Sequence, residues 1–344
     1  MARVRHRTSK IAILSANSGF RPVICACLRR SFAYPARIRR PDHPCRAWLL
    51  QSPRVGVSVE LVLAVSHSVV DEQETDAAAV TSGSSFYLAM RILPAVQRDA
   101  MFQVYAFCRA VDDIADSDLP RAERNAGLNR WRADIDACFA GRPPRHLVAL
   151  DREIRAFNLQ RDDFHAMIDG MAMDAAEDIC APDEPTLDLF CDRVASAAGR
   201  LSVRIFGMPE AEGIALSHHL GRALQLTNIL RDIDDDAAIN RCYLPRELLA
   251  REGIAITDPA TIVRDPALPR VCATLVERAL EHFCQADAVM DTCPRAQVKA
   301  PRIMSGAYRC ILEAAIARGF AAPRAPLRKP KARMLMIAAR YALF

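Results

Sequence analysis

Two short acidic segments constrain this chain most, because each places its carboxylates along one face of an otherwise apolar helix. The segments span residues 105–116 and 225–236. At about 100° per residue, the polar side chains of each segment fall within an arc of roughly 100°. The remaining positions are mostly Ala, Val, Leu, Ile, Phe and Cys. Such a narrow stripe indicates acids that face an internal, water-containing cavity, since a solvated surface helix has a broad polar face.

The residue types on these stripes indicate divalent cations that prefer oxygen ligands. Mg²⁺ binds oxygens at about 2.0–2.1 Å, keeps several waters and commonly bridges carboxylates to substrate phosphates. Acids four residues apart on a helix have Cβ atoms about 5–6 Å apart, which leaves room for the ion and its waters. Zinc prefers Cys and His, so it is a poorer match. The stripe residues are Tyr105, Arg109, Asp112, Asp113 and Asp116 in the first segment, and Gln225, Asn228, Asp232, Asp235 and Asp236 in the second.

Helical periodicity dominates from about Thr81 onward, and the sequence has neither a convincing alternating strand pattern nor a glycine-rich nucleotide loop. Pro and Gly mark the expected breaks between helices. The sequence therefore predicts an all-α protein in which the two acidic helices are walls of one cavity. The predicted helices span residues 95–117, 121–140, 145–157, 161–176, 186–206, 210–236, 246–252, 268–290 and 299–318.

Charge divides the chain into a basic N-terminal stretch and a nearly neutral remainder. Residues 1–75 contain 12 Lys or Arg against 5 Asp or Glu, whereas the remaining residues contain 34 Lys or Arg against 36 Asp or Glu. Nothing in the expected catalytic region therefore indicates a nucleic-acid surface, which requires a clustered basic patch. We predict that residues 1–75 are a disordered or mis-assigned extension and that residues 76–325 form one catalytic domain. Residues 326–344 form a basic and apolar segment, which is open to two interpretations: contact with a membrane surface, or docking on the domain.

The cysteines and histidines of the sequence indicate the cellular compartment and the kinds of metal site to expect. The twelve Cys are scattered, with no CxxC pair or zinc-type spacing, which is typical of a reducing compartment. We therefore predict a cytoplasmic protein, with peripheral contact at the inner membrane face left open. His218 and His219 have no metal-spaced partner nearby in the sequence, so a surface or interhelix role is predicted for them.

The chain resembles the squalene and phytoene synthases over about residues 82–324. The resemblance rests on both acidic segments together with residues 84–87, 91–94, 169–174, 193–199 and 241–245. Within that family, residues 192–202 and 293–295 are most similar to the bacterial presqualene diphosphate synthases of hopanoid pathways.

This resemblance implies an isoprenoid synthase fold, a single helical domain around a central apolar cavity. The implied Mg²⁺ ligands are Asp112, Asp113, Asp116, Asn228, Asp232 and Asp236. The implied substrate-binding residues are Ser84, Ser85, Phe86, Arg109, Gln225, Asn228, Arg241 and Tyr243. The implied catalytic residues are Tyr105, Arg109, Asp112, Asp116, Asp232 and Asp236.

The reaction implied by the resemblance is a head-to-head condensation of two farnesyl diphosphates to presqualene diphosphate. Mg²⁺ is expected, NADPH is not, and the expected partners are downstream squalene-forming enzymes. Three alternatives stay open at this point: a squalene synthase that finishes with NADPH reduction, a phytoene or dehydrosqualene type of synthase, and a non-catalytic assembly protein that retains the fold. The presence of Asp112, Asp116, Asp232 and Asp236 argues against the last.

One position departs from the family pattern. Phe190 stands where the family usually carries a Tyr implicated in diphosphate loss and proton transfer. Tyr105 or the departing diphosphate is left as the proton acceptor, and the sequence does not choose between them.

Overall fold

Helices follow one another from α5 (Ala95–Ala115) to α17 (Lys331–Leu343), and the described residues contain no strand beyond one isolated bridge between Cys180 and Cys242. The computed structural model describes residues 89–176, 179–328 and 330–343. The predicted all-α class is confirmed. The predictions for residues 1–75 and for Ser84, Ser85 and Phe86 lie outside the described residues.

The N-terminal helices surround a small aromatic core. Phe107 of α5 makes edge-on contacts with Trp131 and Phe164, with ring centroids 5.6 and 5.0 Å apart. These rings join α5 to α6 (Arg121–Phe139) and α8 (Arg161–Ala176). Phe107 and Phe164 are almost completely buried, so the three helices share one apolar centre that fixes how α5 presents its acidic face.

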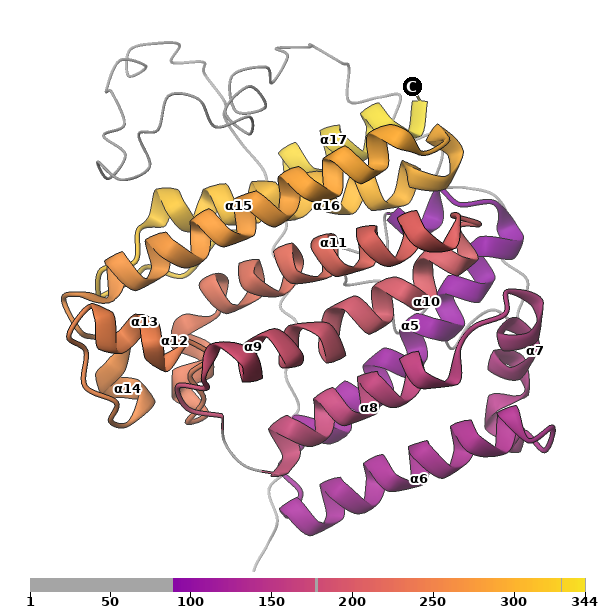
Figure 1. Ribbon diagram of the computed structural model, residues 1–344, viewed down its shortest axis with the longest axis horizontal. Helices are drawn as coiled ribbons and strands as arrows, with labels where there is room; N and C mark the ends of the chain where they lie inside the picture. Colours follow the sequence, from indigo (N-terminus) through magenta and orange to yellow (C-terminus); the bar gives the residue numbers. More distant parts are fainter. Residues whose placement is uncertain (1–88, 177–178, 329, 344) are drawn as a thin grey trace, which may run out of the picture. The chain divides into compact units, whose positions relative to one another are not determined.

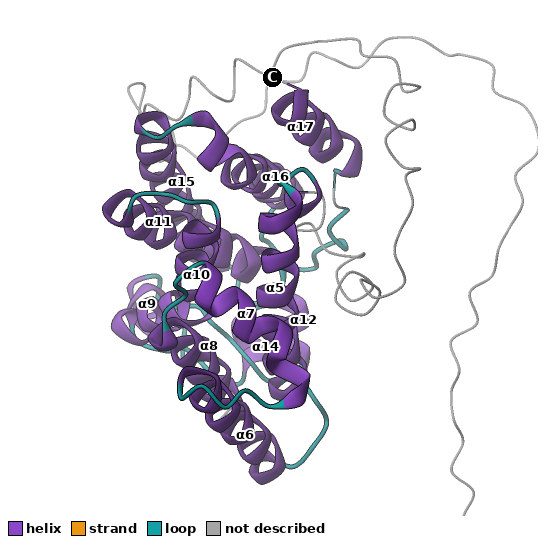
Figure 2. Ribbon diagram, turned by 90° about the vertical axis from the view of Figure 1, so that its right-hand side faces the viewer, coloured by secondary structure: helices purple, strands orange, loops and turns teal. Residues whose placement is uncertain are grey.

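The C-terminal helices pack along α11 (Glu210–Arg231), which runs through the middle of the fold beside α15 (Leu268–Thr292) (Figures 1 and 2). Apolar side chains such as Leu216, Leu230 and Phe283 are buried in this half. The other helical elements are α7 (Val148–Ala156), α9 (Glu184–Cys191), α10 (Ala197–Ile205), α12 (Ile233–Ala238), α13 (Arg246–Arg251), α14 (Pro259–Ile262), α16 (Arg295–Arg318) and the short 3₁₀ turn Arg145–Leu147.

Two predicted helices are interrupted in the structure. Between α9 and α10, Asp192–Ser196 forms a π-helical turn, so residues 186–206 are not one regular helix. The backbone of Gly221 in α11 approaches this turn so closely that a Cβ atom there would lie 2.8 Å from the backbone nitrogen and Cα of Ser196. The predicted helix 210–236 is likewise broken at Asp232, where φ is −100° and ψ is 13°.

The C-terminal segment forms a helix that the sequence interpretation left open. Ile337 of α17 packs against Gly306 of α16, and Ala338 is buried, so this segment docks on the domain. Leu335 and Met336 remain exposed. Peripheral membrane contact through them stays a prediction, which flotation with anionic liposomes tests.

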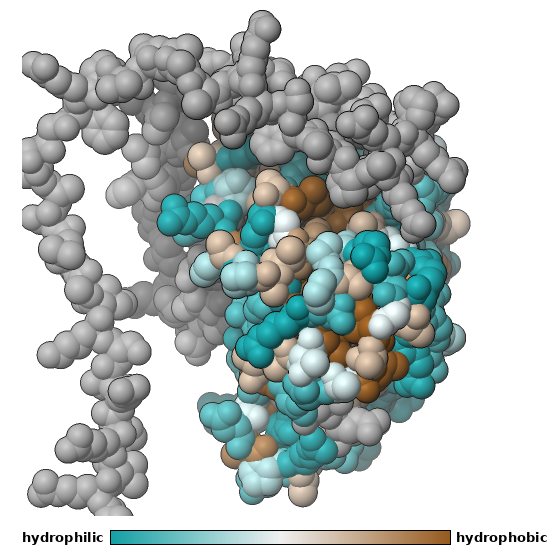
Figure 3. Space-filling model, turned by 90° about the vertical axis from the view of Figure 1, so that its left-hand side faces the viewer, coloured by the Kyte–Doolittle hydropathy of each residue, from teal (hydrophilic) through white to brown (hydrophobic). Residues whose placement is uncertain are grey.

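None of the described helices is both long and apolar enough to span a bilayer. On the face where α12, α13 and α14 lie, the described surface is largely hydrophilic, with limited hydrophobic areas between the polar side chains (Figure 3). Ile239 and Ile256 are among the exposed apolar residues of this part of the chain. Most of the apolar surface is thus turned inward, where it encloses a cavity.

Candidate active site

A cavity of about 510 Å³ lies between the helices, within the size range of about 300–1,000 Å³ that is typical of ligand pockets. Its walls come from α5, α8, α9, α10, α11, α12 and α16, from the π-helical turn, and from residues 89–93 and 241–243. Most of the lining is apolar. The apolar lining residues include Leu93, Met101, Val104, Met167, Met171, Phe190, Val203, Phe206, Leu216, Leu220, Leu224, Ile229 and Met304.

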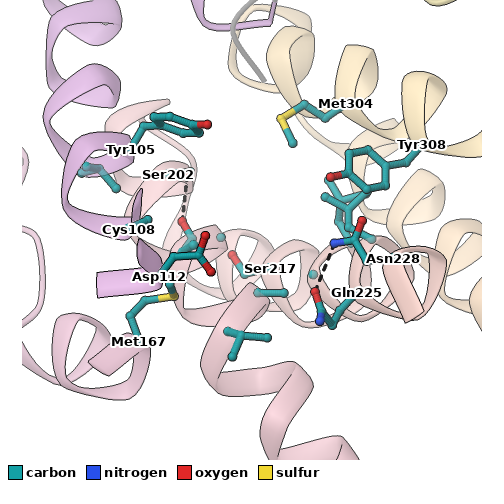
Figure 4. A pocket seen from close by; sticks show the side chains of 18 of the residues that line it. Tyr105, Cys108, Asp112, Met167, Ser202, Ser217, Gln225, Asn228, Met304 and Tyr308 are labelled. Carbon is teal, nitrogen blue, oxygen red and sulfur yellow. Dashed lines mark hydrogen bonds between the residues drawn. The ribbon is translucent and has the colours of Figure 1, made fainter. Parts of the chain in front are cut away.

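The first acidic segment lies on the cavity wall through only part of its stripe. Asp112 and Asp116 line the cavity, together with Tyr105 and Arg109, whereas Asp113 does not. Figure 4 shows Tyr105 and Asp112 projecting from the same helix. Arg109 pairs with both neighbouring acids: its Nη1 lies 3.1 Å from Oδ2 of Asp112 and its Nη2 lies 2.7 Å from Oδ1 of Asp113. The structure therefore separates Asp113 from the other predicted metal ligands.

The second acidic segment crosses the break between α11 and α12. Gln225 and Asn228 come from the last turns of α11, Asp232 is at the break, and Asp236 comes from α12. These four residues line the cavity and Asp235 does not. The Asn228 amide nitrogen donates to Oε1 of Gln225 at 3.2 Å (Figure 4). Its Oδ1 is buried and has no hydrogen-bond donor.

Arg241 connects the two acidic segments, because its backbone N–H donates to the carbonyl oxygen of Asp236 at 2.9 Å and its side chain pairs with Asp116. Its Nη1 donates to Oδ1 of Asp116 at 2.9 Å, across a separation of 125 residues. The Arg241 side chain is 9% exposed and that of Asp116 is 56% exposed, so the polar end of the cavity opens to solvent at Asp116. Beside it, the Tyr243 hydroxyl donates to Asp174 at 2.9 Å. Arg241, Tyr243 and Asp174 all line the cavity.

At the polar end of the cavity, the ionised form of three carboxyl groups is disfavoured, so their pKa values are raised. Burial, followed by repulsion from Asp116, raises the pKa of Asp112 to about 6. Burial, followed by repulsion from Asp232, raises the pKa of Asp236 to about 7. Asp174 is also raised to a pKa of about 6 by burial, although Arg241 and Tyr243 oppose this. Divalent cations would relieve both desolvation and repulsion.

The donor set fits Mg²⁺ on a second ground. The unpaired Oδ1 of Asn228 would be a neutral oxygen ligand, in the same cavity lining as the carboxylates of Asp232 and Asp236. Among the described residues, no three acidic side chains lie close enough together to enclose one ion. Bound ions would therefore be shared with waters and with oxygens of the substrate, as Mg²⁺ is in phosphate-binding sites.

Asp174, Arg231 and Tyr308 line the cavity close to the predicted site residues but were not predicted. Asp174 lies in residues 169–174, which belong to the family resemblance but for which no role was predicted. Arg231 donates from Nε to Asp232 at 2.6 Å. Tyr308 of α16 faces the cavity opposite Tyr105 and close to Asn228 (Figure 4). Arg231 lies inside the second acidic segment but off its polar stripe, and Tyr308 belongs to no periodic polar pattern, so the stripe argument missed both.

An all-helical domain with facing carboxylate sets at the open end of an apolar cavity defines the isoprenoid synthase class. The family model for squalene/phytoene synthase matches residues 79–334. The chain therefore belongs to the squalene/phytoene synthase family.

Relatives within this family are similar over almost their whole length. The chain is 64% identical over 264 residues to presqualene diphosphate synthase of Rhodopseudomonas palustris, covering 77% of this chain and 95% of the relative. It is 56% identical over 261 residues to presqualene diphosphate synthase of Sinorhizobium fredii, covering 76% and 94%.

Solved structures agree with the fold. Squalene synthase HpnC from Alicyclobacillus acidocaldarius matches with a TM-score of 0.66 and 26% identity, covering 77% of this chain and 97% of the other. A dehydrosqualene synthase in complex with a ligand matches with a TM-score of 0.67 at 22% identity, covering 78% and 95%, which supports the fold alone.

Proposed function

We propose that this protein condenses two farnesyl diphosphates head to head into presqualene diphosphate, with release of diphosphate, in squalene and hopanoid biosynthesis. The observation that carries the proposal is the pair of carboxylate sets facing one apolar cavity and joined by Arg241. The high identity to two presqualene diphosphate synthases supports the choice of reaction within the family.

The polar end of the cavity would bind the two diphosphate groups. Arg109 and Arg241 are suited to contact diphosphate oxygens, because a guanidinium offers a planar set of donors. Mg²⁺ would neutralise the charge of the leaving diphosphate and so favour its departure. The residues that would hold Mg²⁺ are Asp112, Asp116, Asn228, Asp232 and Asp236.

The apolar part of the cavity would hold the prenyl chains and exclude water. In the first step, the C–O bond of one farnesyl diphosphate breaks and its electron pair leaves with the diphosphate. The double bond of the second substrate attacks the allylic cation, and loss of one proton closes the cyclopropane ring. Bulk water would quench the cation as an alcohol, so residues such as Leu216, Leu220 and Met304 protect the intermediate. Tyr105 and the released diphosphate are the candidate proton acceptors.

Product analysis tests the proposed reaction. The purified full-length protein is incubated with Mg²⁺ and either farnesyl diphosphate or geranylgeranyl diphosphate, each with and without NADPH, and products are identified by mass spectrometry. We expect presqualene diphosphate from farnesyl diphosphate both with and without NADPH. Squalene formed only with NADPH would indicate a complete squalene synthase, and product from geranylgeranyl diphosphate alone would indicate a phytoene type. No product from either substrate would favour a non-catalytic role.

Phe190 provides a test of the proton-transfer step. Its ring stacks on Tyr243 with centroids 5.0 Å apart and an interplanar angle of 16°, and it lines the cavity. We expect Phe190→Tyr to raise turnover by about tenfold or more, because a phenol would join the hydrogen-bonding groups near Asp174. Single-turnover kinetics measure the change. Phe206→Tyr, which adds a hydroxyl elsewhere in the same cavity, is the control. Equal rates for wild type and Phe190→Tyr would refute this role.

A further inference from the structure

Three histidines that do not line the cavity meet between α11 and α15. His218 and His219 are consecutive in α11, and His282 reaches them from α15. One ring nitrogen of each histidine lies within 4.8 Å of those of the other two. None of the three lines the cavity. The sequence interpretation, in which His218 and His219 lack a metal-spaced partner, overlooks His282 because the helices that carry them are far apart in the chain.

The distances within this cluster are close to those of a metal site. Nδ1 of His219 and Nδ1 of His282 are 3.1 Å apart. Zinc binds imidazole nitrogen at about 2.0–2.1 Å in a tetrahedral arrangement, which places neighbouring ligand nitrogens about 3.3–3.4 Å apart. The nitrogens of His219 and His282, which share a hydrogen bond at this distance, thus need almost no movement to bind one metal ion, and the nitrogen of the third ring needs a shift of up to about 1.4 Å.

The charged groups around the cluster are of both signs: Arg222 disfavours a positive charge on the rings, and Asp188 favours it at His218 and His282. Arg222 is the cation nearest to His218, and its Nε and Nη2 donate to the two oxygens of Asp188 at 2.6 and 2.8 Å. This pairing offsets part of the charge of Arg222, which, in addition to burial, still lowers the pKa of all three imidazoles. Burial lowers the pKa of all three imidazoles, that of His282 to about 4, so the rings are neutral at pH 7. Neutral imidazoles are the form that binds metals.

We infer that His218, His219 and His282 form a binding site for a transition-metal dication of the Zn²⁺ type, which joins α11 to α15. Three imidazole nitrogens with a water as fourth ligand match the ligand preference of Zn²⁺, Co²⁺ and Ni²⁺ and not that of Mg²⁺. Asn228 follows His219 by nine residues, or about 14 Å along the helix, so this site is separate from the carboxylate site. Its role would be to fix the helix that carries Gln225 and Asn228, independently of the proposed reaction.

Metal titration tests the site without any activity measurement. The full-length protein is stripped of metal and titrated with Zn²⁺ by calorimetry in excess Mg²⁺, which occupies the carboxylate site. Co²⁺ replaces Zn²⁺ in a parallel experiment, because its visible absorption reports tetrahedral nitrogen ligands. We expect the wild-type protein to bind one equivalent of Zn²⁺ tightly. His282→Gln and His218→Gln should each weaken the Zn²⁺ affinity by at least about tenfold, since even changes behind a metal ligand have effects of that size.

His146→Gln is the matched control. His146 is exposed, lies in the turn before α7 and has Asp134 as its neighbour. It should leave Zn²⁺ affinity and the Co²⁺ spectrum unchanged. Circular dichroism verifies that each variant is folded. Two cluster variants are used so that the test still holds if one of them misfolds. Absence of tight binding to wild type, or equal Zn²⁺ affinity in wild type and both folded cluster variants, would overturn the inference.

Discussion

Replacing Asp112 with Asn is expected to lower turnover by about 10²–10³-fold while leaving the fold as stable as before or more so. Asp112 lines the cavity beside Asp116 and would be a ligand of Mg²⁺. Its ionised form is disfavoured in the absence of metal, because burial and Asp116 raise its pKa to about 6. A neutral amide removes that unfavourable charge at pH 7 but binds a cation less strongly.

Two measurements distinguish a loss of catalysis in Asp112→Asn from a loss of folding. Turnover is followed by diphosphate release at saturating Mg²⁺, and stability is followed by urea unfolding in Mg²⁺-free buffer. Asp99→Asn, which makes the same change near the start of the same helix and away from the cavity, should affect neither. If Asp112→Asn kept more than about a tenth of wild-type turnover, Asp112 would not be a metal ligand in the rate-limiting step.

Asp113→Asn tests two conflicting predictions about Asp113, one from the helical stripe in the sequence and one from the structure. The stripe and the family resemblance both make Asp113 a metal ligand, whereas its side chain is 57% exposed, is paired with Arg109 and does not itself line the cavity. The structure therefore favours a much smaller loss of turnover for Asp113→Asn than for Asp112→Asn. The reason is geometric, since adjacent residues on a helix point about 100° apart, and here Asp112 lines the cavity while Asp113 does not.

The first acidic segment could be predicted well because it lies within one uninterrupted helix. Its period continues from Tyr105 to Asp112 without a break, so sequence spacing translates directly into a shared face. The all-α class follows from the same periodicity. The second segment is harder, because neither Pro nor Gly marks the break at Asp232 and the apolar pattern runs through it. Only packing against other helices shows that Asp236 reaches the cavity from α12.

The remaining features depend on contacts between distant parts of the chain. Arg241 and Asp116 pair across 125 residues, and His219 and His282 across 63. No local pattern encodes such pairs, since each partner is an ordinary polar residue in its own segment. The resemblance to a family supplied Arg241 and Tyr243 as candidates. It offered no comparable indication for Tyr308 or for the histidine cluster.

Gly221→Ala is expected to lower the free energy of unfolding by about 2 kcal/mol, although alanine is the better helix former. A Cβ atom at Gly221 would lie 2.6 Å from Oγ of Ser196 and 2.8 Å from its Cα and backbone nitrogen. Two of these three neighbours are backbone atoms, so no side-chain rotation relieves the contact. Relief requires α11 to move away from the π-helical turn, at a cost that exceeds the gain of about 0.5–1 kcal/mol in helix propensity.

Gly127→Ala is the matched control, because Gly127 is also inside a helix but meets a side chain instead of backbone. Its added Cβ would lie 3.1 Å from Cγ2 of Ile114, which can adjust. Urea unfolding should therefore show Gly127→Ala within about 1 kcal/mol of wild type. Because Gly221 and Leu224 line the cavity, movement of α11 should also reduce turnover in Gly221→Ala. Equal unfolding midpoints for the two variants would mean that the π-helical turn yields to the added methyl group, and that its close contact with α11 does not hold the cavity in shape.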